Sequence, residues 1–256
     1  SAMPVSNYHA CFIVKDDSFT LLSDAGGGNG ILTQLNAAKI SPAEITHFIL
    51  SHSHSDHILG AVWLIRVLIQ NYLSGQRFGK LKVYANRQTA EALVEICRLT
   101  FLDSYFSKFN TVVDLKIVDT PAAATIGAHT INFFDVGSEN VEQMGFRITF
   151  DDNTTLVSLG DEALTTKNSP EANGADYLIC GAFCRYADRD IFKPYEKHHF
   201  TVKDVAQCAS SANIRNLILY HSEDRTDDKR NKYTIEAKEY FNGNVIIPHD
   251  LDRIQL

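Results

Sequence analysis

The chain has 256 residues, of which 45% are hydrophobic, and a formal net charge of −7. This length can bury one large core or two tightly joined halves, and the acidic balance argues against nucleic-acid binding through a broad basic surface. The longest apolar stretch, residues 58–69, contains Arg66 and is too short to cross a bilayer, so we expect a cytoplasmic protein without membrane contact. Its five cysteines are expected to be reduced. We interpret Ser1 and Ala2 as tag remains and residues 3–256 as one domain.

Strands and helices are expected to alternate over roughly the first 100 residues. A capping box with proline at the first helical position, Ser41-Pro42-Ala43-Glu44, predicts a short helical turn. Residues 58–73 are apolar nearly all round and predict a buried helix. The other expected elements are strands at 7–16, 18–28, 46–50 and 81–85, and a helix from Thr89 to about Asp103.

The second half begins with strand-like segments separated by turn residues, which indicate an antiparallel patch. These segments cover 115–118, 129–136, 145–150 and 154–159. They are followed by a strand at 175–183, a helix that starts with the cap Thr201, a strand at 215–221, a helix at 233–241, and strands at 244–250 and 253–256. Mixed β/α units in both halves predict an α/β fold with two packed sheets and outer helices, an αββα sandwich.

The segment SHSHSDHILG, residues 51–60, contains three histidines and an aspartate within six residues. It lies between a predicted strand and a predicted buried helix, where an open sheet commonly carries its chemistry. Neutral imidazoles and a carboxylate suit a borderline divalent ion, and four such groups can hold two adjacent ions. The alternative is a polar, solvated loop that happens to contain histidines.

Together with LLSDAGGG at 21–28, this motif resembles the metallo-β-lactamase superfamily, and the likeness continues along nearly the whole chain. SLGDEAL at 158–164 looks like the family's glycine-aspartate loop, and LILYHSED at 217–224 looks like its last ligand strand. The resemblance implies a four-layer αββα domain with two divalent ions, zinc foremost and manganese or iron as alternatives. The implied ligands are His52, His54, Asp56, His57, Asp161 and His221.

Residues 197–221, KHHFTVKDVAQCASSANIRNLILYH, are similar to a motif of ribonuclease Z and related phosphodiesterases. That match implies that His199 assists the leaving group, whereas His198 and His199 could instead be surface residues that cap a helix. It implies a metal-dependent phosphodiesterase for a small or nucleotide-like ester, in which a metal-bound hydroxide attacks phosphorus and Asp56 both ligates and orients it. A homodimer, with residues 58–73 as its contact surface, is also implied; burial of that helix within the monomer is the alternative.

Several departures from the family pattern qualify this function. Glu139 stands where a third histidine is expected; it is either a ligand or a solvated carboxylate, and Ser138 or water could also complete the site. Cys180 and Gly181 replace a histidine-glutamate pair that would orient His199. The customary first strand of the family is expected to be either natively absent or removed. No long basic arm is found in the sequence, so tRNA is not expected as the substrate.

Two other functions are compatible with the sequence. The first is a lactonase or another carboxylic-ester hydrolase, because one fold hosts several chemistries. The second is a metal-binding protein whose catalytic site has degenerated. A metal site that includes Cys180 and Cys184 is a further alternative to their burial in the core.

Overall fold

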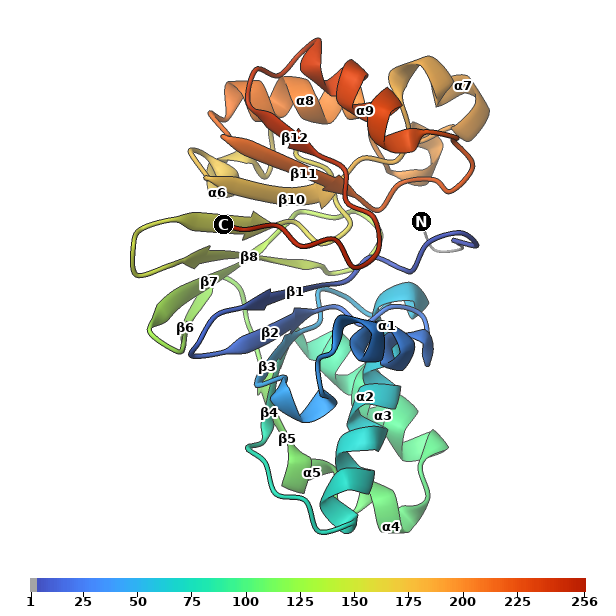
Figure 1. Ribbon diagram of the computed structural model, residues 1–256, viewed down its shortest axis with the longest axis vertical. Coiled ribbons are helices and arrows are strands. Elements are labelled where there is room, and N and C mark those ends of the chain that lie inside the picture. The colour runs from blue at the N-terminus through green and yellow to red at the C-terminus, as the bar shows by residue number, and fades with distance from the viewer. Residues whose placement is uncertain (1–3) are drawn as a thin grey trace. The chain divides into compact units, whose positions relative to one another are not determined.

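The computed structural model describes residues 4–256 and contains two compact units (Figure 1). The N-terminal unit is Tyr8–Thr120, and the C-terminal unit is Pro121–Leu256 together with residues 4–7. Ser1 and Ala2, interpreted as tag remains, lie outside the described residues. Each unit combines one sheet with its own helices, which confirms the mixed α/β class with two sheets.

The N-terminal unit holds a five-stranded sheet in the order β1-β2-β3-β4-β5. β1 pairs with β2 in antiparallel fashion, and the remaining neighbours are parallel. The strands are β1 (Phe12–Lys15), β2 (Thr20–Ser23), β3 (His47–Ile49), β4 (Leu81–Ala85) and β5 (Val113–Ile117). The helices are α1 (Gly30–Ala38), the 3₁₀ turn η1 (Pro42–Glu44), α2 (Ser55–Leu73), α3 (Arg87–Thr100), α4 (Asp103–Phe106) and α5 (Phe109–Val112).

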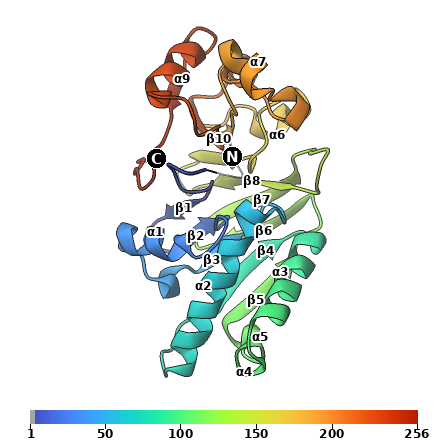
Figure 2. The same ribbon diagram turned by 90° about the vertical axis from the view of Figure 1, so that its right-hand side faces the viewer.

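Helix α2 is the centre of the N-terminal core, as its apolar sequence predicts. Ile58, Leu64 and Leu68 are almost fully buried and belong to one hydrophobic cluster with strand residues such as Phe48 and Val83. Figure 2 shows α2 and α3 side by side over the strands of this unit. Burial of this helix stabilises the junction between β3 and α2, where the histidine motif lies.

The C-terminal unit holds a seven-stranded sheet in the order β12-β11-β10-β9-β8-β7-β6. Pairings from β6 to β9 are antiparallel and those from β9 to β12 are parallel, so the predicted antiparallel patch is confirmed. The strands are β6 (Ala122–Ile126), β7 (His129–Asp135), β8 (Met144–Thr149), β9 (Thr155–Ser158), β10 (Tyr177–Gly181), β11 (Asn216–Tyr220) and β12 (Asn244–Ile246). The helices are α6 (Ser169–Ala172), η2 (Tyr186–Asp188), α7 (Arg189–Phe192), η3 (Tyr195–Lys197), α8 (Val202–Ser211) and α9 (Lys229–Lys238).

Caps and apolar patterns in the sequence predict most helices and strands correctly, and each element that they do not predict has a weak signal of its own. The capping boxes at Ser41 and Thr201 both form. α1 was missed because it follows a glycine-rich run and Asn29 makes no side-chain cap bond, and β6 was missed because its sequence, AAATI, is poor in strand formers. The predicted strand at 253–256 is wrong. Pro248, which has no N–H for a ladder, follows β12 closely, and the N–H of Asp252 then donates to the carbonyl of His249 in a turn.

Across residues 4–256, none of the helices combines the length and apolarity that crossing a membrane would require.

Candidate metal centre

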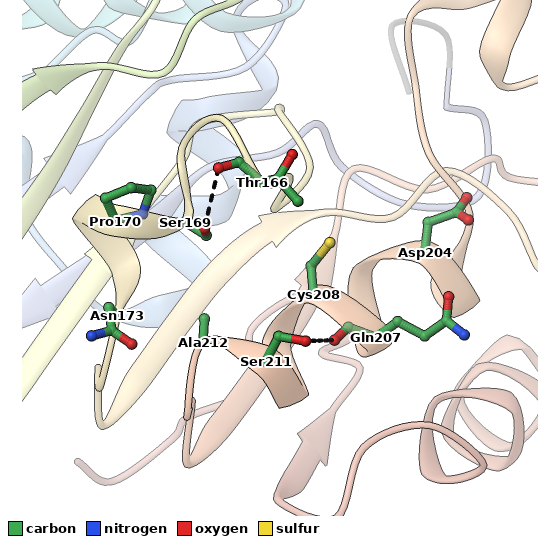
Figure 3. Close-up of a pocket in the computed structure, with 9 residues that line it drawn as sticks. All are labelled: Thr166, Ser169, Pro170, Asn173, Asp204, Gln207, Cys208, Ser211 and Ala212. Carbon is green, nitrogen blue, oxygen red and sulfur yellow. Dashed lines mark hydrogen bonds between the residues drawn. The ribbon is translucent and has the colours of Figure 1, made fainter.

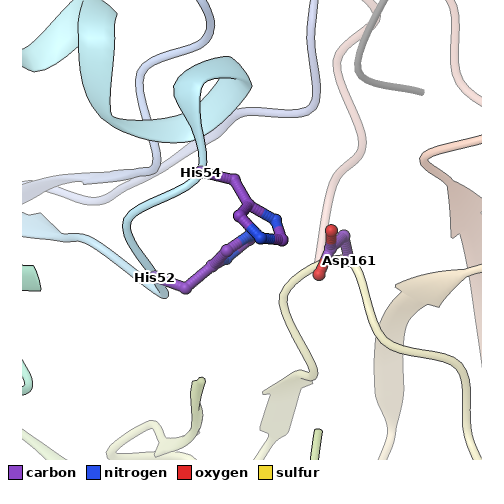
Figure 4. A group of neighbouring side chains, drawn as sticks. All are labelled: His52, His54 and Asp161. Atoms are coloured by element: carbon purple, nitrogen blue, oxygen red, sulfur yellow. The ribbon is translucent and has the colours of Figure 1, made fainter. Parts of the chain in front are cut away.

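The histidine motif lies on the segment between β3 and α2, as its position in the sequence predicts. His54 is the N-cap of α2, and Asp56 lies in the first turn, where the helix dipole favours a carboxylate. The ring centroid of His52 lies 4.5 Å from that of His54 and 4.1 Å from that of His57. Figure 4 draws His52 and His54 on this segment. The N-terminal unit therefore gathers three imidazoles and one carboxylate of the predicted ligand set.

Asp24, just beyond β2, is the hydrogen-bonding centre behind these rings. It is only 2% exposed, and its Oδ1 accepts a bond of 2.8 Å from the backbone N–H of Ser51. Its Oδ2 accepts bonds from the Ser51 hydroxyl at 2.7 Å and from Nδ1 of His57 at 2.9 Å. Ser51 Oγ in turn lies 2.9 Å from Nδ1 of His52. One buried carboxylate thus holds two of the predicted ligands.

This network decides which nitrogen of each ring carries the proton. A carboxylate only accepts, so Nδ1 of His57 must donate to Asp24. Ser51 has one hydroxyl proton and gives it to Asp24, so its oxygen accepts from Nδ1 of His52. In the neutral form of each ring the lone pair is then on Nε2, where it can bind a metal. A carboxylate behind a ligating histidine is a recurring feature of metal sites. The donor set therefore fits a divalent cation such as zinc.

Gly60, at the end of the histidine motif, allows α2 to approach the loop after β2. A Cβ on Gly60 would lie 1.8 Å from the carbonyl oxygen of Ala25. The backbone N–H of Gly60 donates to Gly26, and that of Ala25 donates to the carbonyl of His57. Only glycine permits this approach, which fixes Asp24 beside His57.

The C-terminal unit carries the two remaining predicted ligands, which follow β9 and β11, the strands on either side of β10. Asp161 follows β9 (Figure 4), and His221 follows β11 in the left-handed region, with φ of 48°. Oδ2 of Asp161 lies 3.6 Å from Nε2 of His221. The hydroxyl of Tyr220 donates to the carbonyl of Gly160, which anchors the loop that carries Asp161. A second carboxylate–imidazole pair is therefore preformed in this unit.

His199 lies in the same unit and close to His221, with ring centroids 5.3 Å apart. The glutamate that would orient it is replaced by an aromatic contact. The imidazole stacks on Phe183 with centroids 4.9 Å apart and planes 19° apart. Phe183 is itself held through its carbonyl, which accepts from the Tyr233 hydroxyl and from the N–H of Glu223. The ring orientation of His199 is thus restrained by stacking, with His221 as its neighbour.

Glu139 lies on the surface, on the loop between β7 and β8. Its side chain is 76% exposed and lies 3.5 Å from Nδ1 of His198, which is itself half exposed. Burial raises the pKa of the nearby Glu162, a hydrogen bond from Ser138 lowers it, and the charge of Asp161 adds to the rise. This arrangement favours the solvated alternative for Glu139 and a surface role for His198.

Cys180 and Cys184 are both fully buried, and Cys180 belongs to the hydrophobic core of the C-terminal unit. Burial raises the pKa of each thiol to about 12, so neither is readily available as a thiolate ligand. Gly181, beside Cys180, is required by a close approach, because a Cβ there would lie 2.1 Å from the carbonyl oxygen of Asp161. A glutamate at this position is therefore sterically excluded in the present backbone.

A separate pocket of about 520 Å³ lies between α8 and the segment around α6 (Figure 3). It contains none of the predicted site residues. Its lining is mostly small and polar, and consists of Thr166, Ser169, Pro170, Asn173, Asp204, Gln207, Cys208, Ser211 and Ala212. This pocket therefore has no evident part in the chemistry of the histidine motif.

Three supporting residues were missed from the sequence: Asp24, Phe183 and Gln143. An aspartate directly before AGGG and after a buried strand was an available signal for Asp24. Gln143, which donates to Asp161, and Phe183 carry no recognisable spacing, because their partners are distant in the sequence.

Comparisons with known proteins agree with this architecture. The family described as "Beta-lactamase superfamily domain" matches residues 20–222. A ribonuclease Z from Pyrobaculum neutrophilum is 28% identical over 253 residues, covering 89% of this chain and 85% of that protein. The human short form of tRNase Z superposes with a TM-score of 0.71 at 17% identity, covering 96% of this chain and 92% of that one. A diphosphatase of the PhnP family also gives 0.71, at 18% identity and 96% and 85% coverage.

The family match covers most of the chain, and the matched range includes the residues of the two preformed groups described above. The fold of this family implies bound divalent metal ions, and the structure supplies histidine and aspartate donors for them. The chain belongs to the beta-lactamase superfamily, where it resembles ribonuclease Z, and it is a metal-dependent hydrolase.

Proposed function

We propose that the protein is a metal-dependent phosphodiesterase that acts on a small or nucleotide-like phosphoester. Membership of the family supports the metal dependence, and the likeness to proteins named ribonuclease Z supports phosphodiester chemistry. The observation that carries the proposal is the network of Asp24, because it leaves Nε2 of His52 and of His57 with lone pairs for metal ions.

In this proposal two divalent ions are held by the six predicted ligands. The residues that would hold these ions are His52, His54, Asp56 and His57 of the N-terminal unit and Asp161 and His221 of the C-terminal unit. Three protein ligands and one open position are typical of a catalytic zinc site, so a third histidine is not required. When bound, such ions supply an activated water and neutralise charge that develops on the phosphoryl oxygens. Zinc is the first candidate for these donors, and manganese or iron are the alternatives.

Two residues of the chain act on the reacting groups. Asp56 ligates and also accepts a hydrogen bond from the attacking water, which orients it toward phosphorus. His199 donates a proton to the departing oxygen, a role that a restrained imidazole beside a ligand histidine can perform. Positioning and charge stabilisation account for most of the rate enhancement in phosphoryl transfer.

The substrate is the least constrained part of the proposal. The names of the relatives weigh against the expectation that tRNA is not a substrate, so an RNA substrate belongs in the test. A lactonase would use the same donors on a carboxylic ester, and a degenerate metal-binding protein would bind metal without turnover.

A substrate panel distinguishes these functions. Bis(p-nitrophenyl) phosphate, a precursor tRNA, a lactone and p-nitrophenyl acetate are offered to the protein reconstituted with zinc, manganese or iron. Hydrolysis of the phosphodiester that a chelator abolishes and metal restores supports the proposal. Asp56→Ala should abolish it, whereas Asp17→Ala, the same change at an exposed turn, should not. Turnover of the carboxylic esters alone would contradict the phosphodiesterase assignment.

Leaving groups of different basicity test the role of His199. His199→Gln should slow hydrolysis of a diester with an alkoxide leaving group by about 10²-fold or more, because that oxygen needs a proton. The same variant should retain most activity toward p-nitrophenyl esters, whose leaving group departs as an anion. His249→Gln, at an exposed histidine of the same unit, serves as the control. Equal losses on both substrates would contradict the proton-donor role.

Homodimerisation remains a separate prediction, as does a cytoplasmic location. Most of α2 is buried in its own unit, but Trp63 and Leu73 are 40% and 46% exposed, which leaves an apolar contact of limited size. Sedimentation at micromolar concentration that finds only 28.6 kDa species would contradict the dimer.

A further inference from the structure

Gln143, immediately before β8, has a buried side chain that no sequence motif marks. It is 2% exposed, and its Nε2 donates to Oδ1 of Asp161 at 2.6 Å and to the carbonyl of Leu159 at 3.4 Å. Because both neighbours are acceptors, this end of the amide must be the NH₂ group, and the orientation of the side chain is determined by its partners.

The backbone around Gln143 is also fixed. The N–H of Val136 donates to the carbonyl of Gln143 at 3.2 Å, which closes the base of the loop that carries Glu139. That loop includes the position where the family pattern leads us to expect a third histidine. Gln143 therefore lies at the fixed base of the loop, whereas Glu139 is on its exposed part.

Because of the bond from Gln143, the two carboxylate oxygens of Asp161 face different partners. Oδ1 is held by the amide, and Oδ2 lies 3.6 Å from Nε2 of His221. A neutral donor leaves the carboxylate with its charge while it restricts rotation about the last side-chain bond. Oδ2 is thus held on the same side as the imidazole nitrogen, which is the arrangement that two ligands of one ion need.

We propose that Gln143 is the positioning residue for Asp161, and that it stabilises this chain's metal centre in the absence of a third histidine. The inference rests on the proposed function, because it requires that Asp161 is a ligand. The amide acts through Asp161 and is not itself assigned as a ligand.

The test compares wild type with Gln143→Met, which keeps the shape of the side chain and removes its donor. Gln207→Met, at an exposed glutamine on α8, is the matched control. Zinc is titrated in competition with a chromophoric chelator, and the visible spectrum of the cobalt-substituted protein reports the geometry of the ligands. We expect about 10- to 100-fold weaker binding of the ions and an altered cobalt spectrum for Gln143→Met alone.

A second variant covers the case in which Gln143→Met does not fold. Gln143→His retains a ring N–H as donor to Asp161 and should recover part of the affinity. Wild-type affinity and an unchanged cobalt spectrum in folded Gln143→Met would overturn the inference and leave the proposed function intact. If wild type itself binds no metal, both the inference and the proposed function fail.

Discussion

Replacing Asp24 by asparagine tests the tautomer argument with the smallest possible change of shape. The carboxylate accepts three hydrogen bonds, from the N–H and hydroxyl of Ser51 and from Nδ1 of His57. An asparagine has one acceptor and an NH₂ group in the same place. If its oxygen accepts from the N–H of Ser51, its NH₂ faces Nδ1 of His57. The ring must then move its proton to Nε2, and the lone pair needed by a metal is lost.

The expected size of this effect follows from the number and kind of bonds that are lost. Loss of a supporting partner behind a metal-ligating histidine typically weakens metal binding by about 10- to 100-fold, or about 1.4–2.8 kcal/mol. The metal-free protein also loses charge-assisted bonds at a buried site. At about 1.5–3 kcal/mol for each such bond, the free energy of unfolding should fall by several kcal/mol, of which relaxation recovers a part.

Two measurements check the prediction. Competition with a chelator gives the metal affinity of Asp24→Asn, and ¹⁵N NMR of the imidazole nitrogens gives the tautomer of His57 in the metal-free protein. Asp17→Asn, the same substitution at an exposed position, is the control and should behave as wild type. Should Asp24→Asn keep both the wild-type affinity and a proton on Nδ1 of His57, the reasoning is refuted.

Three other predictions follow from buried contacts. Burial lowers the pKa of His47 from 6.5 to about 4, so between these pH values the unfolded chain binds a proton that the folded chain does not. The free energy of unfolding should therefore be unaffected by His47 above pH 6.5 and should fall by about 3 kcal/mol as the pH drops to 4. Urea unfolding should find a smaller loss over that range for His47→Phe than for wild type, and equal losses would contradict the shift. Gly181→Ala should displace the loop of Asp161 and weaken zinc binding, measured by chelator competition, while an unchanged affinity would show that the loop yields easily. Gly60→Ala should lower the melting temperature by several degrees, because its methyl group meets the carbonyl of Ala25; a melting temperature within one degree of wild type would contradict that clash.

The elements of the fold were largely predictable because their signals are local. Capping residues at Ser41 and Thr201 act within one helical turn, and the apolar run of α2 is long enough to indicate burial. The errors lie where local signals are weak or where an apolar run is interrupted. The alanine-rich β6 is held in the sheet by its pairing with β7, which its own sequence does not indicate.

The candidate ligands were visible in the sequence for a related reason. The spacing of His52, His54, Asp56 and His57 is local, so the sequence by itself determined the type of metal donor and the family. What supports those donors was decided only by the tertiary structure. Asp24 contacts His57 from 33 positions away, and Gln143 reaches Asp161 across 18.

The residues of the family pattern that this chain lacks could also be read from the sequence, but the contacts that take their place could not. The sequence showed that a glutamate was missing beside His199, and packing placed the face of Phe183 there. It showed glycine at 181, and the close approach of the Asp161 carbonyl gave the reason. A hydrogen bond or a stacked ring depends on where two distant backbones meet, and no periodicity or spacing in the chain encodes that meeting point, so only the folded protein reveals which residues orient the donors.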